Sequence, residues 1–79
     1  MHKFLELVIK PLVNFPEEVE IELIEDDESM IYQLYLNPED IGRVVGKNGS
    51  TINAIRTLMQ ARPSDDGRRI GLELVEEDD

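Results

Sequence analysis

Two glycines that bracket a lysine and an asparagine form the segment of this 79-residue chain with the clearest chemical potential. Gly46-Lys47-Asn48-Gly49 lies between two stretches whose apolar spacing predicts helices. Glycine at both ends allows a sharp turn. The second helix would begin directly after the loop, where its backbone N–H groups and dipole favour a phosphate. The segment therefore predicts an anion-binding turn, although the same four residues also suit a plain joint between two helices.

The sequence offers few residues that could catalyse a reaction. The chain has no cysteine, which excludes disulfides, zinc–cysteine sites and thiol nucleophiles. His2 is the only histidine, so a histidine-based triad or metal cluster cannot form. Gly42 and Gly46 are separated by three residues where a P-loop needs four. We therefore expect no enzymatic activity, no cofactor and no metal site.

The charge of the chain is strongly acidic but unevenly distributed. Eighteen acidic residues against eight basic ones give a net charge of −10. Residues 15–40 contain ten acidic side chains and no basic one, whereas residues 41–64 contain four basic side chains and no acidic one. Because charges are screened over about 8–10 Å, a ligand responds to the local field more than to the total. The segment around the glycine loop is therefore the part of the chain best suited to an anion.

Hydrophobic periodicity predicts the elements ahead of this loop. Residues 2–13 place their apolar side chains on one helical stripe, and Pro11 should kink or end that helix near Lys10. Apolar and polar residues then alternate over 19–23 and again over 30–36, with a polar turn at 25–29. This pattern predicts two antiparallel strands joined as a hairpin.

The glycine loop itself should separate two helices. Asn37 can cap the first, Pro38 suits its first position, and the two acids that follow favour its positive end, so this helix should run to about Val45. Ser50 or Thr51 should start the second helix, which we expect to reach residue 61. Residues 63–67 are typical of a loop, residues 70–74 alternate as a last strand, and residues 76–79 form an acidic tail.

The predicted order is αββααβ in a single α+β domain that spans residues 1–79, with its core at about 3–75. A hairpin makes its two strands antiparallel, and the two-helix connection to the last strand is long enough for a right-handed parallel crossover. We therefore expect a three-stranded mixed sheet covered on one face by three helices.

The stretch from Ile41 to Ile55 resembles the Ile-Gly-x-x-x-Gly-x-x-Gly-x-x-Ile core of the KH domain, whose loop clamps about four nucleotides of a single strand. The element order resembles the type II arrangement of that domain. Over residues 3–75 the chain is similar to the small bacterial KhpA-type RNA-binding proteins. Pro11 inside the first helix and the net charge of −10 depart from what that family leads us to expect.

The resemblance implies a role for individual residues. Gly46 and Gly49 would turn the backbone, and Lys47 and Asn48 would face phosphates. Apolar side chains before and after the loop would wall a groove under the bases, or would serve as ordinary core. The RNA-binding residues implied in this way are Gly46, Lys47, Asn48, Gly49, Arg43, Ile41, Val45, Ser50, Ile52 and Arg56, with Val44 as a further groove candidate. Arg68 and Arg69, at the start of the last strand, would flank the groove or form a charged edge.

The resemblance also implies partners and a location. We expect binding of single-stranded RNA in the cytoplasm, as an RNA chaperone or post-transcriptional regulator linked to cell shape and division. A homodimer, or a heterodimer with a second KH protein of the KhpB type, is expected. No apolar run approaches the roughly 18 residues of a membrane span. The alternative is a protein-interaction module that pairs with another KH protein and has only residual contact with RNA.

Overall fold

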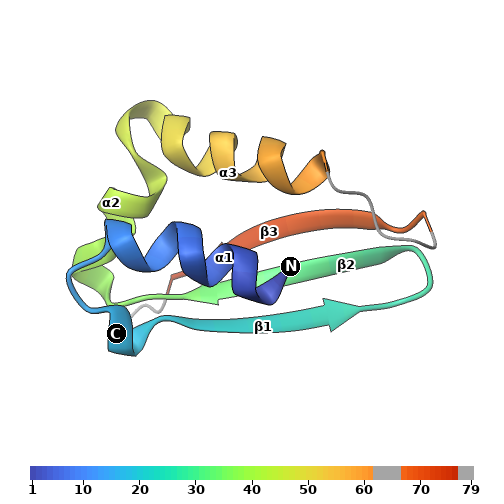
Figure 1. The fold of residues 1–79 in the computed structure, drawn as a ribbon, viewed down its shortest axis with the longest axis horizontal. Helices are drawn as coiled ribbons and strands as arrows, with labels where there is room; N and C mark the ends of the chain where they lie inside the picture. Colours follow the sequence, from blue (N-terminus) through green and yellow to red (C-terminus); the bar gives the residue numbers. More distant parts are fainter. Residues whose placement is uncertain (62–66, 77–79) are drawn as a thin grey trace.

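The computed structural model describes residues 1–61 and 67–76 of the chain (Figure 1). Helix α1 (His2–Ile9) buries Leu5 and Ile9 and passes directly into a 3-10 turn over Lys10–Leu12. Pro11 explains the change, because it has no N–H to donate to an α-helical hydrogen bond. The break predicted near Lys10 is confirmed, and the α-helix is correspondingly shorter than the 2–13 stretch. A second 3-10 turn, Pro16–Glu18, leads into the sheet.

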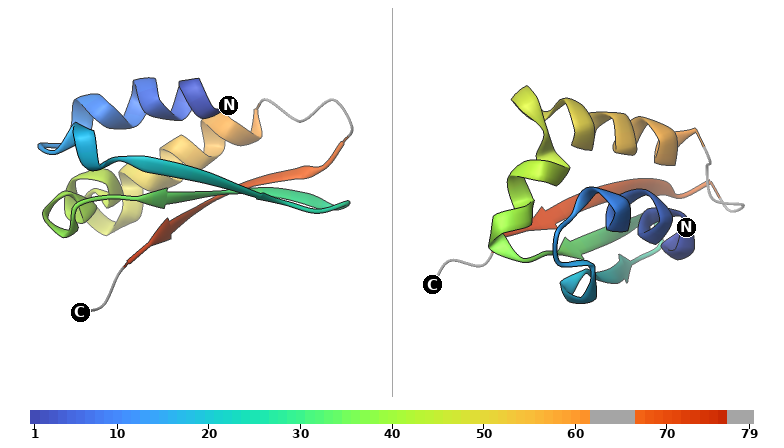
Figure 2. Two further views of the ribbon diagram at one scale, coloured as in Figure 1. Left: turned by 90° about the horizontal axis from the view of Figure 1, so that it is seen from below. Right: turned by 60° about the vertical axis from the view of Figure 1, so that its left-hand side comes forward.

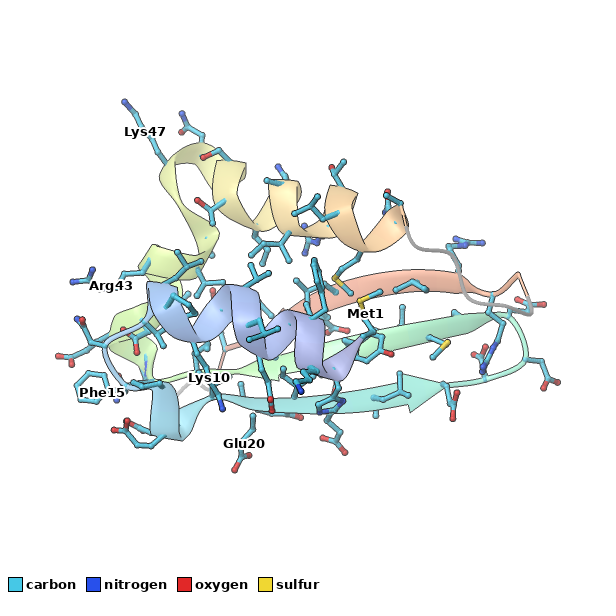
Figure 3. All side chains as sticks on the ribbon, viewed as in Figure 1. Met1, Lys10, Phe15, Glu20, Arg43 and Lys47 are labelled. Atoms are coloured by element: carbon cyan, nitrogen blue, oxygen red, sulfur yellow. The ribbon has the colours of Figure 1, made fainter. Side chains whose placement is uncertain are left out.

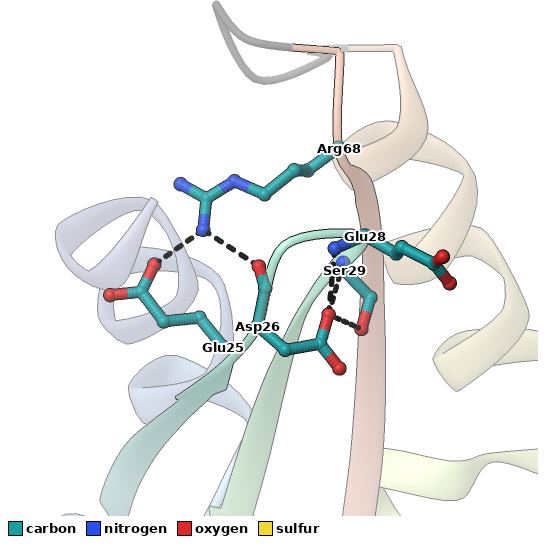
Figure 4. Close-up of polar contacts among 5 residues, drawn as sticks. All are labelled: Glu25, Asp26, Glu28, Ser29 and Arg68. Atoms are coloured by element: carbon teal, nitrogen blue, oxygen red, sulfur yellow. Dashed lines mark hydrogen bonds and ion pairs between the residues drawn. The ribbon is translucent and has the colours of Figure 1, made fainter.

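Strands β1 (Glu20–Glu25) and β2 (Ser29–Tyr35) form the predicted antiparallel hairpin, in a register that pairs Leu23 with Tyr32. One side chain shapes the turn between them. The carboxylate of Asp26 accepts the backbone N–H groups of Glu28 and Ser29, both at 2.8 Å (Figure 4). Such a local side-chain acceptor stabilises a tight polar turn.

Strand β3 (Arg69–Val75) runs parallel to β2, and the sheet order is β1-β2-β3. The mixed three-stranded sheet predicted from the connection lengths is confirmed. The crossover between the two parallel strands contains α2 (Ile41–Val45) and α3 (Ser50–Gln60). Figure 1 shows α2 at one end of the sheet and α3 above β3.

All three helices lie on one face of the sheet, as Figure 2 shows. The side chains between the two layers form one apolar core: Leu5, Ile9, Tyr32, Leu34, Val44, Ile52, Ile55, Met59, Ile70 and Leu72. The alternation along each strand sends the other residues to the uncovered face, where Ile24 is 48% exposed. This one-sided cover explains why the strands alternate rather than reading as continuous apolar runs.

Two predicted features lie outside the described residues. The expected loop at 63–67 falls there except for Gly67, and so does most of the acidic tail at 76–79. Among the helices that the structure describes, none is long and apolar enough to cross a membrane.

Candidate nucleic-acid interface

The segment that leads to the glycine loop begins with a capped turn. The side chain of Asn37 accepts the backbone N–H of Glu39 at 2.8 Å, at the start of a 3-10 turn over Pro38–Asp40 that continues as α2. This is the cap predicted from the sequence. Helix α2 ends where Gly46 donates its N–H to the carbonyl oxygen of Gly42 at 2.9 Å. The capped start and this last bond fix both ends of a very short helix.

The loop itself turns the chain through three left-handed residues. Gly46 has a φ of 77°, Asn48 a φ of 57° and Gly49 a φ of 76°. Glycine and asparagine are the residues that adopt this region most readily. Residues 47–49 form a tight turn rather than a regular helix, closed by the hydrogen bond that the Gly49 N–H donates to the Gly46 oxygen at 3.2 Å. The predicted break between two separate helices at 46–49 is therefore confirmed.

Gly46 is required for a second reason. A Cβ placed on it would lie 2.7 Å from the Cβ of Thr51 and 2.9 Å from its backbone nitrogen. No side chain fits at such distances. At Gly49 a Cβ would meet only the side-chain nitrogen of Asn53, at 3.6 Å. The first glycine thus allows close packing of the loop against α3, and the second supplies only the backbone conformation.

The polar side chains of the loop face solvent at its tip. Lys47, Asn48 and Ser50 are exposed, and Figure 3 shows Lys47 pointing away from the body of the protein. Helix α3 begins directly after the loop, and the unbonded backbone N–H groups of a first helical turn point out from its N-terminus. Lysine charge and helix dipole therefore act together on any anion that approaches the tip.

Arg43 lies on α2, one turn before the loop, and its side chain is 56% exposed. Its Nε is 3.9 Å from a carboxylate oxygen of Asp40. The amide oxygen of Asn14, in the orientation that satisfies its neighbours, accepts from Nε at 3.2 Å and from Nη2 at 3.1 Å. These contacts with Asp40 and Asn14 hold one edge of the Arg43 guanidinium. Figure 3 shows the side chain at the outer end of the molecule.

Two other arginines that the sequence analysis considered are engaged within the protein. The Nε of Arg56 donates to the carbonyl oxygen of Leu72 at 3.1 Å, and so links α3 to β3. Arg68 pairs with Glu25 at 2.8 Å and donates to the Asp26 carbonyl oxygen at 3.2 Å (Figure 4). Figure 1 places this hairpin turn at the opposite end of the sheet from the loop. Arg68 therefore clamps the turn and does not flank the loop.

The apolar residues around the loop divide into two groups. Val44 is fully buried and Ile52 is 6% exposed, and both belong to the core under the helices. Ile41 and Val45 remain partly exposed. Each of these four apolar side chains was expected either to line a groove or to fill the core, and Val44 and Ile52 fill the core. Ile41 and Val45 are the pair still accessible beside the loop.

The two tyrosines separate as their alternation predicts. Tyr32 is 4% exposed within the core, and burial raises the pKa of its hydroxyl. Tyr35 lies on the uncovered face. Its hydroxyl oxygen is 3.2 Å from a carboxylate oxygen of Glu22 and 3.2 Å from the side-chain oxygen of Gln33, either of which can accept its hydrogen bond. Within residues 1–61 and 67–76, no group of three or more His, Cys, Asp or Glu side chains is placed to hold a metal ion.

Asp40 is a site residue that the sequence analysis missed. Its position in the sequence predicts only an acid that favours a helix start, yet Asp40 is fully buried. Its two oxygens accept the backbone N–H groups of Asn14 and Phe15, at 2.9 and 3.0 Å. These partners lie 26 and 25 positions earlier in the chain, and no periodicity or spacing signals such a pairing.

The sequence of the chain is similar to those of several known proteins. The family model for the KH domain of KhpA and KhpB matches residues 2–74. The chain is 44% identical over 77 residues to a Chlamydia pneumoniae protein named RNA-binding protein KhpA, which covers 98% of this chain and 99% of the relative. Relatives of the same name in Listeria monocytogenes and Oceanobacillus iheyensis are 43% and 37% identical, covering 96% and 95% of this chain and 100% of each relative. No solved structure matches significantly. The chain belongs to the KhpA/KhpB KH-domain family.

Proposed function

We propose that this protein binds single-stranded RNA, without catalysis, through the loop Gly46–Gly49. One observation carries the proposal: the loop presents an exposed lysine directly in front of the N-terminus of α3. A helix N-terminus with an adjacent cation is suited to a phosphate. The relatives named RNA-binding protein KhpA support the same ligand.

In this proposal each part of the site has a separate task. Lys47, Asn48 and the first turn of α3, including the exposed Ser50, receive successive phosphates of the strand. Arg43 contacts a further phosphate at the outer end of α2. The bases then lie over Ile41 and Val45, the apolar side chains that stay accessible. Phosphate contacts of this kind fix position without reading sequence, so discrimination between bases should be weak.

The acidic body favours a single strand over a duplex. Ten acidic residues lie between positions 15 and 40, and the net charge is −10. A rigid duplex would bring phosphates of both strands near this surface, whereas a flexible strand can follow the loop alone. Repulsion of phosphates by the surrounding carboxylates therefore acts mainly on the duplex.

The resemblance to the family supports a finer proposal. We propose an RNA chaperone or post-transcriptional regulator in the cytoplasm, linked to cell shape and division. A single KH module contacts few nucleotides, so a second module would raise the affinity by making the second contact intramolecular. A homodimer, or pairing with a second KH protein of the KhpB type, would supply it.

One structural feature favours such pairing as a function in its own right. Leu7 on α1 and Leu58 on α3 are large apolar side chains that are 68% and 52% exposed, on helices whose other faces cover the core. Where such side chains join into a contiguous patch, they mark a protein contact site. A protein-interaction module is therefore the second candidate function.

The test is a titration with a labelled single-stranded RNA, followed by fluorescence anisotropy. Replacement of both Lys47 and Asn48 by Asp puts two negative charges at the loop tip, where side chains bury little. We expect the variant to fold, by circular dichroism, and to bind RNA more than about tenfold more weakly. An unlabelled single strand should compete better than a duplex of equal length. Wild-type affinity in the folded variant would favour the interaction module instead.

A further inference from the structure

Asp40 is a buried charged residue without an assigned role in the site. Its side chain is 1% exposed, and it is the one charged residue that the described part of the protein buries completely. A buried carboxylate is costly unless it is hydrogen-bonded or paired. The contacts of Asp40 therefore indicate what the fold gains by keeping a charge there.

The first contacts tie two distant segments together. Both carboxylate oxygens accept backbone N–H groups from the connection between α1 and β1, at Asn14 and Phe15. Asp40 itself lies immediately before α2. The connection is thereby fixed against the base of the helix that leads to the loop, and its side chains hold a defined position beside α2.

The second contact reaches the proposed RNA-binding surface. Arg43 lies 3.9 Å from the Asp40 carboxylate, and the Asn14 amide oxygen accepts from its Nε and Nη2. Asp40 thus acts on Arg43 in two ways: by direct attraction, and by placing Asn14 through the backbone N–H of that residue. The guanidinium is oriented along one edge while more than half of the side chain faces solvent.

We infer that Asp40 is a positioning residue for RNA binding, which holds Arg43 through Asn14 in the orientation that receives a phosphate. This inference rests on the proposed function. Arginine has many rotamers, and ordering them on binding weakens the complex. An arginine already oriented by a carboxylate and an amide loses less freedom when the phosphate arrives.

An opposite effect of the same charge is the competing possibility. The Asp40 carboxylate is negative and could repel a phosphate that approaches Arg43. Two observations favour the positioning role: the carboxylate is buried, and both of its oxygens are already hydrogen-bonded to backbone N–H groups. The two effects have opposite signs, so one measurement separates them.

The experiment is a double-mutant cycle on RNA affinity. Asp40→Asn alone should weaken binding by about three- to tenfold, and Arg43→Gln alone by a similar factor. In the Arg43→Gln background, Asp40→Asn should cost less than about twofold, because the residue it positions is already gone. A purely structural role would give the same loss in both backgrounds. Tighter binding by Asp40→Asn would show that the carboxylate masks Arg43, and would overturn the inference.

Two further variants keep the test decisive. Asn14→Ala removes the amide that contacts Arg43 but leaves the backbone N–H bonds to Asp40, so it should fold even if Asp40→Asn does not, and it should weaken binding about two- to threefold. Asp26→Asn is the matched control, since Asp26 also accepts two backbone N–H groups, at the far end of the sheet. It should leave RNA affinity unchanged.

The loop variant with Asp at positions 47 and 48 separates the two claims. If it loses RNA while Asn14→Ala and Asp40→Asn bind as the wild type does, the inference fails and the proposed function stands. If it keeps wild-type affinity, the loop is not the site, and the proposed function fails with the inference that rests on it.

Discussion

Gly46 packs against Thr51 at a distance that no other residue could tolerate. A Cβ on Gly46 would lie 2.7 Å from that of Thr51, and the backbone there has a φ of 77°. The loop is therefore built on one close approach between the end of α2 and the start of α3. The shape of the loop depends on that contact as well as on backbone freedom.

Replacement of the two loop glycines should destabilise the protein unequally. Gly49→Ala meets only an unfavourable αL conformation, and should lower the free energy of unfolding by about 1–2 kcal/mol. Gly46→Ala meets both a backbone conformation that essentially only glycine adopts and the clash with Thr51, and should lower it by about 2–5 kcal/mol. Urea denaturation followed by circular dichroism measures both. Equal losses for the two variants would contradict the close approach.

The hairpin turn should make stability depend on pH. Hydrogen bonds from the backbone N–H groups of Glu28 and Ser29 hold the pKa of the Asp26 carboxyl below its usual 3.8. A lowered pKa in the folded state contributes stability that is present above pH 3.8 and is lost as the pH falls through the folded value. Urea unfolding of wild type and Asp26→Asn, from pH 6 to pH 2.5, checks this.

The contribution of the Asp26 carboxylate is the difference in the free energy of unfolding between the wild type and Asp26→Asn. The wild type should be the more stable at pH 6, and the difference should shrink below pH 3.8 as the carboxylate is protonated. A difference that stays constant down to pH 2.5 would mean that the charge of Asp26 is irrelevant to the turn.

The salt dependence of RNA binding should be shallow. Arg56 and Arg68 are engaged within the protein, and the proposed site holds two other cations, Lys47 and Arg43. Release of counterions from a single strand contributes about −0.7 per phosphate, so two contacts predict a log–log slope of about −1.4. Titrations at several salt concentrations measure it.

Two variants show which side chains produce that slope. Lys47→Ala should halve it, to about −0.7, and Arg68→Gln should leave it unchanged while lowering stability. A wild-type slope steeper than about −2.8 would require four or more phosphates. More basic side chains would then have to take part.

Self-association should depend on the leucines of the helical layer. Leu7→Asp together with Leu58→Asp should convert the proposed homodimer into a monomer by light scattering, because charge is costly in an apolar contact. Ile24→Asp is the matched control, since Ile24 is a similarly exposed apolar residue on the opposite face. Dissociation by Ile24→Asp alone would move the contact to the uncovered sheet.

Much of the fold was accessible from local patterns. The alternation in the strands gave the one-sided cover, the Asn37 cap and Pro11 marked helix boundaries, and the connection lengths gave the mixed sheet. The loop was also accessible, because its glycines act through local backbone conformation. These features depend on residues that are close together in the sequence.

The pairing of the charged side chains was not accessible in the same way. Asp40 bonds to residues about 25 positions away, Arg56 to a strand 16 positions away, and Arg68 to a turn 42 positions away. Those partners meet only once the sheet and helices have packed. The burial of Val44 and Ile52, and the partial exposure of Ile41 and Val45, likewise depend on how α2 packs against α3. Spacing in the sequence alone does not determine that packing.

The most direct test maps the RNA on the protein. In ¹⁵N-labelled protein titrated with a short single-stranded RNA, the largest backbone amide shifts should fall on Gly46–Ile52, with smaller ones around Arg43. The hairpin turn at Asp26 and the uncovered face at Ile24 should be unaffected. Shifts centred on the uncovered face or on the leucines of α1 and α3, with the loop unchanged, would contradict the account.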